Sequence, residues 1–413
     1  MRNIWDKMKS VLANIVSLGK NKDDDISQYK AKVIRHRIKS WKRIGIIVLL
    51  LLAAAGLVSV VMQKRVYHKY TVMASSQEED TVATSYAGMG KGILKYTSES
   101  ASFVDSKGEV VWNQTYEMQN PVLDQCEDTA VIADIKGSSM YMFDTKGQIG
   151  SVETTLPILK AKVAAQGVVV AILEDGEKTW VNFYSSDGTI IAENQTRIDS
   201  PGYPTDVAIS PNGLLIMVTY LYVENGATTS YVAFYNFGDA GQNEIDNLVS
   251  GYTYEGLLVP QVEYLTEDTA LAFREDGFSV YKGNQIPEES QKIECENEIV
   301  STFCNSEYIG MVFKNDGKDD SEEDAAKAYT MTVYTTGGRQ VFAKDFDIAY
   351  KEIKLSDDMI IMNNDSQVCL MSLKGVEKFN GNLEEGAIRS IFKTASNRYM
   401  VVTDTGVHTI KFK

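Results

Sequence analysis

The sequence repeats a pattern in which a strand-like stretch ends in an aromatic or apolar residue and runs into a glycine turn. Seven such turns occur, and their final glycines are 39, 41, 50, 45, 55 and 37 residues apart. Glycine suits these turns because tight hairpins need a positive φ, which is unfavourable for residues with a Cβ atom. The turns end at Gly108, Gly147, Gly188, Gly238, Gly283, Gly338 and Gly375.

Each unit around these turns divides into four stretches rich in Val, Ile, Tyr, Phe and Thr, as β-strands are. In the second unit they read PVLDQC, TAVIADI, SMYMFDT and QIGSVET, and in the third LKAKVAA, GVVVAIL, TWVNFYS and TIIAENQ. A period near 40 residues with four strands predicts a β-propeller, because each small sheet buries its faces only against its neighbours. Polar insertions at 224–229 and 316–327 lengthen two intervals, and we interpret them as hairpin loops. A pair of β-sandwiches is the alternative architecture.

The C-terminal end indicates the number of blades. After Ala387 three strands follow, IRSIFKT, YMVVTDT and VHTIKFK, without a fourth. The stretch near residues 70–75 precedes the first unit and can supply the missing strand, which would leave the ring without a free edge. We therefore expect an all-β propeller of eight four-stranded blades, with seven blades as the alternative.

A second feature is the uncharged run at residues 44–62, which reads IGIIVLLLLAAAGLVSVVM. A helix of this length rises about 28 Å, close to the ~30 Å hydrocarbon thickness of a bilayer. The run is longer than the apolar part of a cleaved signal peptide, and more than forty residues precede it. We predict a transmembrane helix after a basic helical head at 1–43, followed by a juxtamembrane stalk at 63–81 and a propeller at 82–413.

Charge differs on the two sides of the predicted span. The head has 12 Lys and Arg against 4 Asp and Glu, whereas residues 71–413 have 26 against 52. Because basic flanks stay in the cytoplasm, we expect the N-terminus inside the cell membrane and the acidic domain outside it. The basic segment 28–43 favours contact with anionic lipid, and segment 1–20 has an apolar face for the inner leaflet or a partner. Nucleic acid is not an expected partner, because its phosphates need Lys and Arg.

Catalytic side chains are scarce. The three histidines are His36 in the head, His68 beside the span and His408 in the last predicted strand, where we expect a structural role. A Ser-His-Asp or Cys-His site would depend on His408, and most zinc sites would lack ligands. The four cysteines show no CxxC spacing, and if any pair forms a disulfide, Cys295 with Cys304 is the closest in sequence.

No catalytic, cofactor-binding or metal-binding residue is therefore assigned. The acidic loop 315–324 lacks the ligand spacing of a calcium loop. Quinone dehydrogenases share the eight-bladed ring, but their tryptophan repeat is missing, since only Trp112 and Trp180 follow the span. Carboxylates are abundant, so a glycosidase-like or lyase-like pair stays open, but with 52 acidic residues the sequence does not single out two.

Four segments resemble a family of unknown function found in Gram-positive bacteria. Its members look like this chain, with a basic head, one span and a propeller-like extracytoplasmic domain, and the likeness covers most of residues 30–413. The resemblance implies architecture and location, and it carries no established catalytic residues. The segments are WNQTYEMQNP (Trp112–Pro121), TTLPI (Thr154–Ile158), SPNG (Ser210–Gly213) and VAFYNFG (Val232–Gly238).

The leading hypothesis is a non-catalytic, membrane-anchored propeller that binds an unknown envelope protein or wall polymer. The alternative is an envelope carbohydrate-active enzyme with paired carboxylates in the propeller cleft, which predicts acidic side chains of raised pKa together at the centre of the ring. A sensor that signals across the span to the head is a third hypothesis, weakened by the shortness of the head. No cofactor is expected.

Overall fold

The computed structural model of the chain describes residues 48–49, 64–76, 83–176, 178–197, 201–224, 226–315, 327–356 and 358–413. The chain divides into two compact units, residues 1–65 and 66–413. The predicted head and the predicted span, apart from Val48 and Leu49, lie outside the described residues. Within the described part of the chain, no helix has the length and apolar character needed to cross a membrane.

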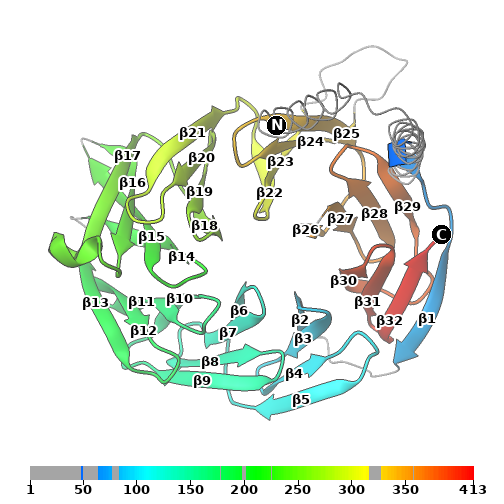
Figure 1. The fold of residues 1–413 in the computed structure, drawn as a ribbon, viewed down its shortest axis with the longest axis horizontal. Coiled ribbons are helices and arrows are strands. Elements are labelled where there is room, and N and C mark those ends of the chain that lie inside the picture. Colours follow the sequence, from blue (N-terminus) through cyan, green and yellow to red (C-terminus); the bar gives the residue numbers. More distant parts are fainter. Residues whose placement is uncertain are drawn as a thin grey trace, which may run out of the picture. The chain divides into compact units, whose positions relative to one another are not determined.

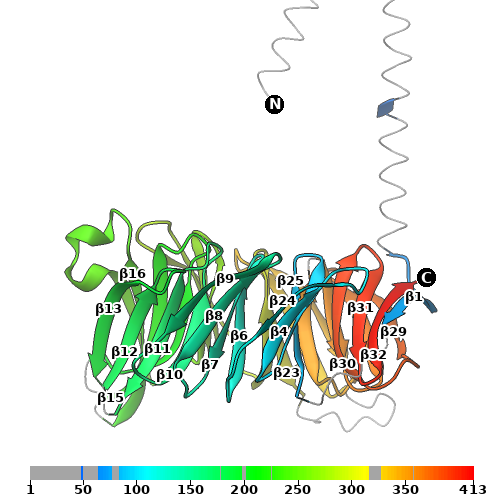
Figure 2. The ribbon, with the colours of Figure 1, turned by 90° about the horizontal axis from the view of Figure 1, so that it is seen from below.

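Residues 66–413 form a ring of eight antiparallel sheets with four strands each (Figure 1). Figure 2 shows this ring from the side, where the strands run between its two faces. Seven blades use consecutive strands, and the eighth combines the first strand of the ring with the last three. The predicted all-β, eight-bladed propeller is therefore confirmed, and the sandwich and seven-bladed alternatives are wrong.

Blades 1 to 4 follow the chain order, with the innermost strand first (Figure 1). Blade 1 contains β2 (Ser85–Met89), β3 (Gly92–Tyr96), β4 (Ser100–Val104) and β5 (Val110–Thr115). Blade 2 contains β6 (Pro121–Cys126), β7 (Thr129–Asp134), β8 (Ser139–Asp144) and β9 (Gly147–Glu153). Blade 3 contains β10 (Ile158–Val163), β11 (Val169–Asp175), β12 (Lys178–Tyr184) and β13 (Ile190–Arg197). Blade 4 contains β14 (Tyr203–Ile209), β15 (Leu215–Glu224), β16 (Ala227–Asn236) and β17 (Leu248–Glu255).

Blades 5 to 8 complete the ring. Blade 5 contains β18 (Gln261–Thr266), β19 (Thr269–Arg274), β20 (Gly277–Lys282) and β21 (Glu288–Glu294). Blade 6 contains β22 (Ile299–Cys304), β23 (Tyr308–Lys314), β24 (Tyr329–Thr335) and β25 (Gln340–Phe346). Blade 7 contains β26 (Glu352–Ser356), β27 (Met359–Asn363), β28 (Gln367–Ser372) and β29 (Glu377–Asn382). Blade 8 contains β30 (Ile388–Ala395), β31 (Arg398–Thr403), β32 (Gly406–Phe412) and β1 (Tyr70–Ser76).

β1 closes the ring by pairing antiparallel with β32, from Tyr70 opposite Phe412 to Ser76 opposite Val407. This strand lies where the sequence led us to expect it, so the propeller begins before residue 82. Behind the pair, the fully buried ring of Phe412 lies 4.4 Å, centroid to centroid, from Phe379. The rings of Tyr67, Tyr70 and Tyr399 also pack against Phe412.

His408 is part of this closure. Its Nδ1 lies 2.8 Å from Ser75 Oγ on β1, and its Nε2 lies 3.1 Å from Thr403 Oγ1 on β31. The side chain is buried, and burial lowers the pKa of His408, although the nearby charge of Glu385 opposes this shift. The lowered pKa favours the neutral imidazole at neutral pH. Both ring nitrogens are occupied by hydroxyl partners inside blade 8, in agreement with the structural role expected for this histidine.

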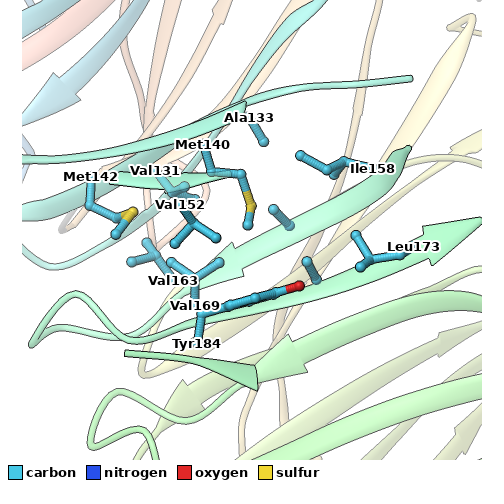
Figure 3. Close-up of a cluster of buried hydrophobic side chains, with 12 residues drawn as sticks. Val131, Ala133, Met140, Met142, Val152, Ile158, Val163, Val169, Leu173 and Tyr184 are labelled. Atoms are coloured by element: carbon cyan, nitrogen blue, oxygen red, sulfur yellow. The ribbon is translucent and has the colours of Figure 1, made fainter. Parts of the chain in front are cut away.

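The core consists of apolar clusters between neighbouring blades. Figure 3 shows one of them, in which Val131, Met140 and Met142 of blade 2 pack against Val163 and Val169 of blade 3. Strands near the middle of a blade are covered on both faces, so all six residues of β7 are buried. This two-sided burial explains why such strands read as continuous apolar runs rather than as alternating ones.

Six of the seven repeated turn glycines have a positive φ, including Gly108 at +87°. At that turn, Asp105 Oδ1 accepts hydrogen bonds from the backbone N–H groups of Lys107 and Glu109 at 2.8 and 3.0 Å. Gly238 is the exception, because its φ is not positive and its N–H donates to Asn236 Oδ1 at 2.7 Å. The expectation of a positive φ is therefore wrong at that one position.

The insertion predicted as a loop at 224–229 is mostly strand. β15 continues to Glu224 and β16 begins at Ala227, so both strands are ten residues long. The extra length of this unit also includes two short 3-10 helices, η1 (Gly241–Asn243) and η2 (Ile245–Asn247). Of the second insertion, residues 316–326 lie outside the described part of the chain.

Candidate functional site

A pocket of about 560 Å³ lies among the inner strands of blades 2 to 5, which are neighbours around the centre of the ring (Figure 1). We call it the inner pocket. Its charged lining residues come from four successive inner strands. On one of these strands two of them lie two residues apart and therefore share a face. The charged lining residues are Asp124 on β6, Lys160 and Lys162 on β10, Asp206 on β14 and Glu263 on β18.

Lys162 is the centre of this charged group. Its Nζ lies 3.0 Å from Asp124 Oδ1 and 3.0 Å from Glu263 Oε1, so one ammonium bridges blades 2, 3 and 5. The exposed fractions of the three side chains are 17% for Lys162, 19% for Asp124 and 30% for Glu263. In such partly desolvated surroundings the ion pairs are stronger than they would be at the open surface.

The aspartates also connect neighbouring blades through the backbone. Asp124 Oδ2 accepts a hydrogen bond from the N–H of Val163 at 2.9 Å, which joins blade 2 to blade 3. Asp206 Oδ2 accepts one from the N–H of Val262 at 2.8 Å, which joins blade 4 to blade 5. The other oxygen of Asp206 lies 2.8 Å from Lys160 Nζ. Both aspartates therefore hold inner strands together while they face the pocket.

Burial has the largest effect on the pKa values of Asp124, Glu263 and Lys162 in the inner pocket. It raises the pKa of Asp124 and of Glu263, in each case against the opposing charge of Lys162. Burial alone would lower the pKa of Lys162, but the charges of Asp124, Glu263 and Asp206 raise it above its ordinary value. Lys162 is therefore the permanently charged member of the group at neutral pH, and the carboxylates depend on it for their ionised form.

The paired-carboxylate hypothesis expected acids of raised pKa at the centre of the ring, and the structure brings Asp124 and Glu263 together there. Each oxygen is 3.0 Å from the same nitrogen, so the two oxygens are at most about 6 Å apart. The lining of the inner pocket contains no histidine, cysteine or hydroxyl side chain. A covalent mechanism in this pocket would therefore have to use a carboxylate or a lysine amine.

None of these five residues was singled out from the sequence, and the three acids could not be, because 52 acidic side chains follow residue 70. One usable signal was present. The predicted strand LKAKVAA carries Lys160 and Lys162 two residues apart in a lysine-poor part of an acidic domain, which places both on one face.

The cysteines and the described histidines lie outside the inner pocket. All four cysteines are free thiols, so the open question of a Cys295–Cys304 disulfide is answered in the negative by this structure. Burial, together with the charge of Glu263, raises the pKa of Cys304 to about 12, and burial raises that of Cys126 to about 11. These thiols remain protonated at neutral pH and are poor nucleophiles. Among the described residues, no cluster of three His, Cys, Asp or Glu could hold a metal ion.

In three of the four segments that carry the family resemblance, a side chain makes a structural contact. The ring of Trp112 stacks on Phe143 of the next blade at 5.1 Å, centroid to centroid. In the third segment, Ser210 Oγ accepts a hydrogen bond from the N–H of Leu215 at 2.9 Å and shapes a turn. In the fourth, Asn236 Nδ2 donates to the carbonyl oxygen of Gln285 at 2.8 Å, which joins blades 4 and 5.

A model of a family of unknown function (DUF5711) matches residues 63–412. No protein of curated function matches the chain. Among solved structures, a eukaryotic initiation factor is similar at 11% identity and a TM-score of 0.50, over 82% of this chain and 93% of its own. BamB from Moraxella catarrhalis (11% identity, 84% and 100% covered, TM-score 0.48) and Sqt1 from Chaetomium thermophilum (13%, 84% and 97%, 0.48) also match. At such identities the likeness is one of fold.

Proposed function

Because the chain belongs to the DUF5711 family, whose function is unknown, we propose a role from the propeller itself, that of a non-catalytic binding or scaffold protein of the cell envelope. The protein is anchored by the helix predicted at 44–62, with its N-terminus in the cytoplasm and the propeller outside. Its partner is an envelope protein or wall polymer, and the basic head contacts anionic lipid. Among the described features, the ion pairs and hydrogen bonds of the carboxylates in the inner pocket support this proposal best.

The carboxylates of the inner pocket are already used by the ring. Asp124 and Glu263 bind Lys162, and Asp206 binds Lys160 and the backbone of blade 5. Groups held in this way stabilise the blades and are poorly placed to transfer protons to a substrate. The same pocket still offers groups for binding, since the Val122 side chain is 52% exposed and that of Lys160 is 39% exposed.

The segment between the predicted span and the first strand of the propeller is short. The predicted span ends at residue 62 and β1 begins at Tyr70, so seven residues separate them. Fully extended, seven residues reach at most about 25 Å. A ring held this close to a membrane would meet partners at the membrane surface rather than far from it.

The proposal predicts that a photo-crosslinking amino acid at Val122 captures a partner in intact cells that make the protein. Val111 provides the matched control, because it is 53% exposed but lies on β5, the outer strand of blade 1. We expect discrete crosslinked products from position 122 and several-fold fewer from position 111, followed by identification of the captured protein or polymer. Equal capture at both positions, or none at position 122, would contradict binding at the centre of the ring.

A carbohydrate-active enzyme is the second candidate, because Asp124 and Glu263 have raised pKa values and face one pocket. Their oxygens are within about 6 Å of each other, which suits a retaining mechanism and is too short for an inverting one. Lys162 occupies the space between them, and this argues for the binding role. Release of reducing ends from cell-wall polysaccharide by the full chain, abolished in Glu263→Gln, would favour the enzyme. No release by the unaltered chain would eliminate it.

A further inference from the structure

A second pocket, of about 500 Å³, lies between three hairpins of blades 7, 8 and 1. We call it the lysine pocket. Its walls are the end of β26, the end of β30 and the turn between β2 and β3, which follow one another around the ring in Figure 1. Three lysines line it, one from each blade, and no acidic residue is among the lining residues. They are Lys354 of blade 7, Lys393 of blade 8 and Lys91 of blade 1.

Lys354 is fixed in place by its neighbours. Its Nζ lies 4.0 Å from the centre of the Phe392 ring, 2.9 Å from Glu352 Oε1 and 2.9 Å from Ser390 Oγ. With these three neighbours around its ammonium, Lys354 contributes positive charge to the wall of the pocket. Burial lowers the pKa of Lys354 while Glu352 raises it, and a bound anion would further favour the charged form.

The other two lysines differ in their surroundings. Lys393 is 7% exposed and forms an ion pair with Asp358, whose side chain is 75% exposed. Lys91 is exposed, and within the described part of the chain no salt bridge engages its ammonium.

The glycines around Lys91 let its hairpin approach the pocket closely. Gly90 has a φ of +56°, which a residue with a side chain rarely adopts. A Cβ atom on Gly88 would lie 2.9 Å from the Phe392 ring, in the wall of the pocket. Between the lysines the wall therefore includes bare backbone at the glycines, the Phe392 ring and the hydroxyl residues Ser356, Thr394 and Ser396.

The charge of this region sets it apart from the rest of the propeller. Residues 351–413 have 9 Lys and Arg against 8 Asp and Glu, whereas residues 71–350 have 17 against 44. A cluster of cations in an otherwise acidic domain focuses positive potential and attracts anions. All three cations are lysines, which bind phosphate as point charges.

We propose that the lysine pocket binds the phosphate group of a phosphate ester, with Lys91 as its main contact and Lys354 and Lys393 as its inner wall. The volume suits a small organic ligand rather than a bare ion. The ester is either a soluble metabolite or a lipid headgroup, since the same phosphate chemistry occurs in both. This site is independent of the role proposed for the inner pocket, because the two pockets share no residue.

Isothermal titration of the full chain in a non-ionic detergent tests the site, with glycerol 3-phosphate and short-chain dihexanoyl phosphatidylglycerol as probes. We expect binding that weakens at higher salt and that falls at least tenfold in Lys91→Glu. Lys91 is exposed, so this change leaves the fold intact. Lys146→Glu is the control, because Lys146 is an exposed lysine in a turn of blade 2 and should change the affinity less than twofold.

Each outcome decides the proposal. Binding of glycerol 3-phosphate that depends on Lys91 assigns a soluble ester, and binding of the short-chain lipid alone assigns a headgroup. Failure of both probes to bind at millimolar concentration would overturn the site. Equal weakening by Lys91→Glu and Lys146→Glu would also overturn it, because the interaction would then be a general effect of charge.

Discussion

Replacing Phe412 with alanine is expected to lower the free energy of unfolding by about 3–5 kcal/mol. The ring of Phe412 is fully buried and packs against four other aromatic rings, two of which precede or begin β1. The substitution leaves a cavity behind the β1–β32 pair, where main-chain pairing and the Ser75–His408 contact would still hold the two ends of the ring together. Denaturant unfolding of the full chain, followed by tryptophan fluorescence and circular dichroism, measures the change.

Tyr203→Ala is the matched control for Phe412→Ala. Tyr203 is also an aromatic residue in a strand, the first residue of β14, but it is 38% exposed. We therefore expect its replacement to lower the free energy of unfolding by less than about 1 kcal/mol. Equal losses in the two variants would mean that the closing blade is not where the ring depends on packing.

Replacing Lys162 with methionine is expected to lower the free energy of unfolding by about 3 kcal/mol at neutral pH, the lower end of the range for breaking a buried pair, because the partly buried Asp124 and Glu263 lose their shared cation. The folded-state pKa of both carboxyls would then rise further above the ordinary values of 3.8 and 4.5. The folded variant would bind more protons than its unfolded state, so its stability increases as the pH falls from 7 towards those ordinary values. The difference in the free energy of unfolding between the variant and the unaltered protein should therefore become smaller as the pH falls.

Lys292→Met is the control for the Lys162 variant. Lys292 pairs with Glu294 at 2.8 Å, but the two side chains are 42% and 63% exposed, and such pairs contribute little. We expect a loss below about 1 kcal/mol without a marked pH dependence. A Lys162 variant as stable as the Lys292 variant would show that the inner pocket does not need its central cation.

The repeat architecture was predictable because its signals are local. The predicted strands PVLDQC and SMYMFDT coincide with β6 and, to within one residue, with β8, since glycine turns and apolar runs mark both ends. The closing strand could also be inferred, because three C-terminal strands required a fourth. These features depend on residues that are close together in sequence.

The contents of the two pockets could not be predicted in the same way. Asp124 and Glu263 are far apart in sequence and meet only because the ring brings blades 2 and 5 within reach of Lys162. The lysine pocket joins Lys91 to Lys393 across the closure of the ring. Such proximity depends on blade number and strand register, and neither can be read from the spacing of charges.

Buried polar contacts between blades were missed for the same reason. Arg274 is almost completely buried on β19, where its Nε donates to Asp276 Oδ1 at 2.7 Å and its guanidinium lies 5.6 Å from the centre of the Tyr254 ring on β17. In sequence this arginine resembles any charged residue at the end of a strand. Its contact with Tyr254 on the neighbouring blade becomes visible only in the folded ring.

The two pockets give the propeller two different surfaces for recognition. The inner pocket in blades 2 to 5 holds three acids against two lysines, whereas the lysine pocket in blades 7, 8 and 1 has no acidic lining residue. A binding protein of the envelope could use one surface for a partner and the other for a phosphate ester. Neither use requires a catalytic residue.

The location of the propeller is the claim on which the envelope role depends, and a phosphatase reporter that is active only outside the cytoplasm tests it most directly. Fused after Lys413 of the full chain in intact cells, the reporter is expected to be active, and deletion of residues 44–62 should abolish that activity. A fluorescent protein that folds only in the cytoplasm should give the reverse pattern at the same position. A phosphatase that is inactive on the full chain, with a fluorescent cytoplasmic fusion, would contradict the proposed envelope function.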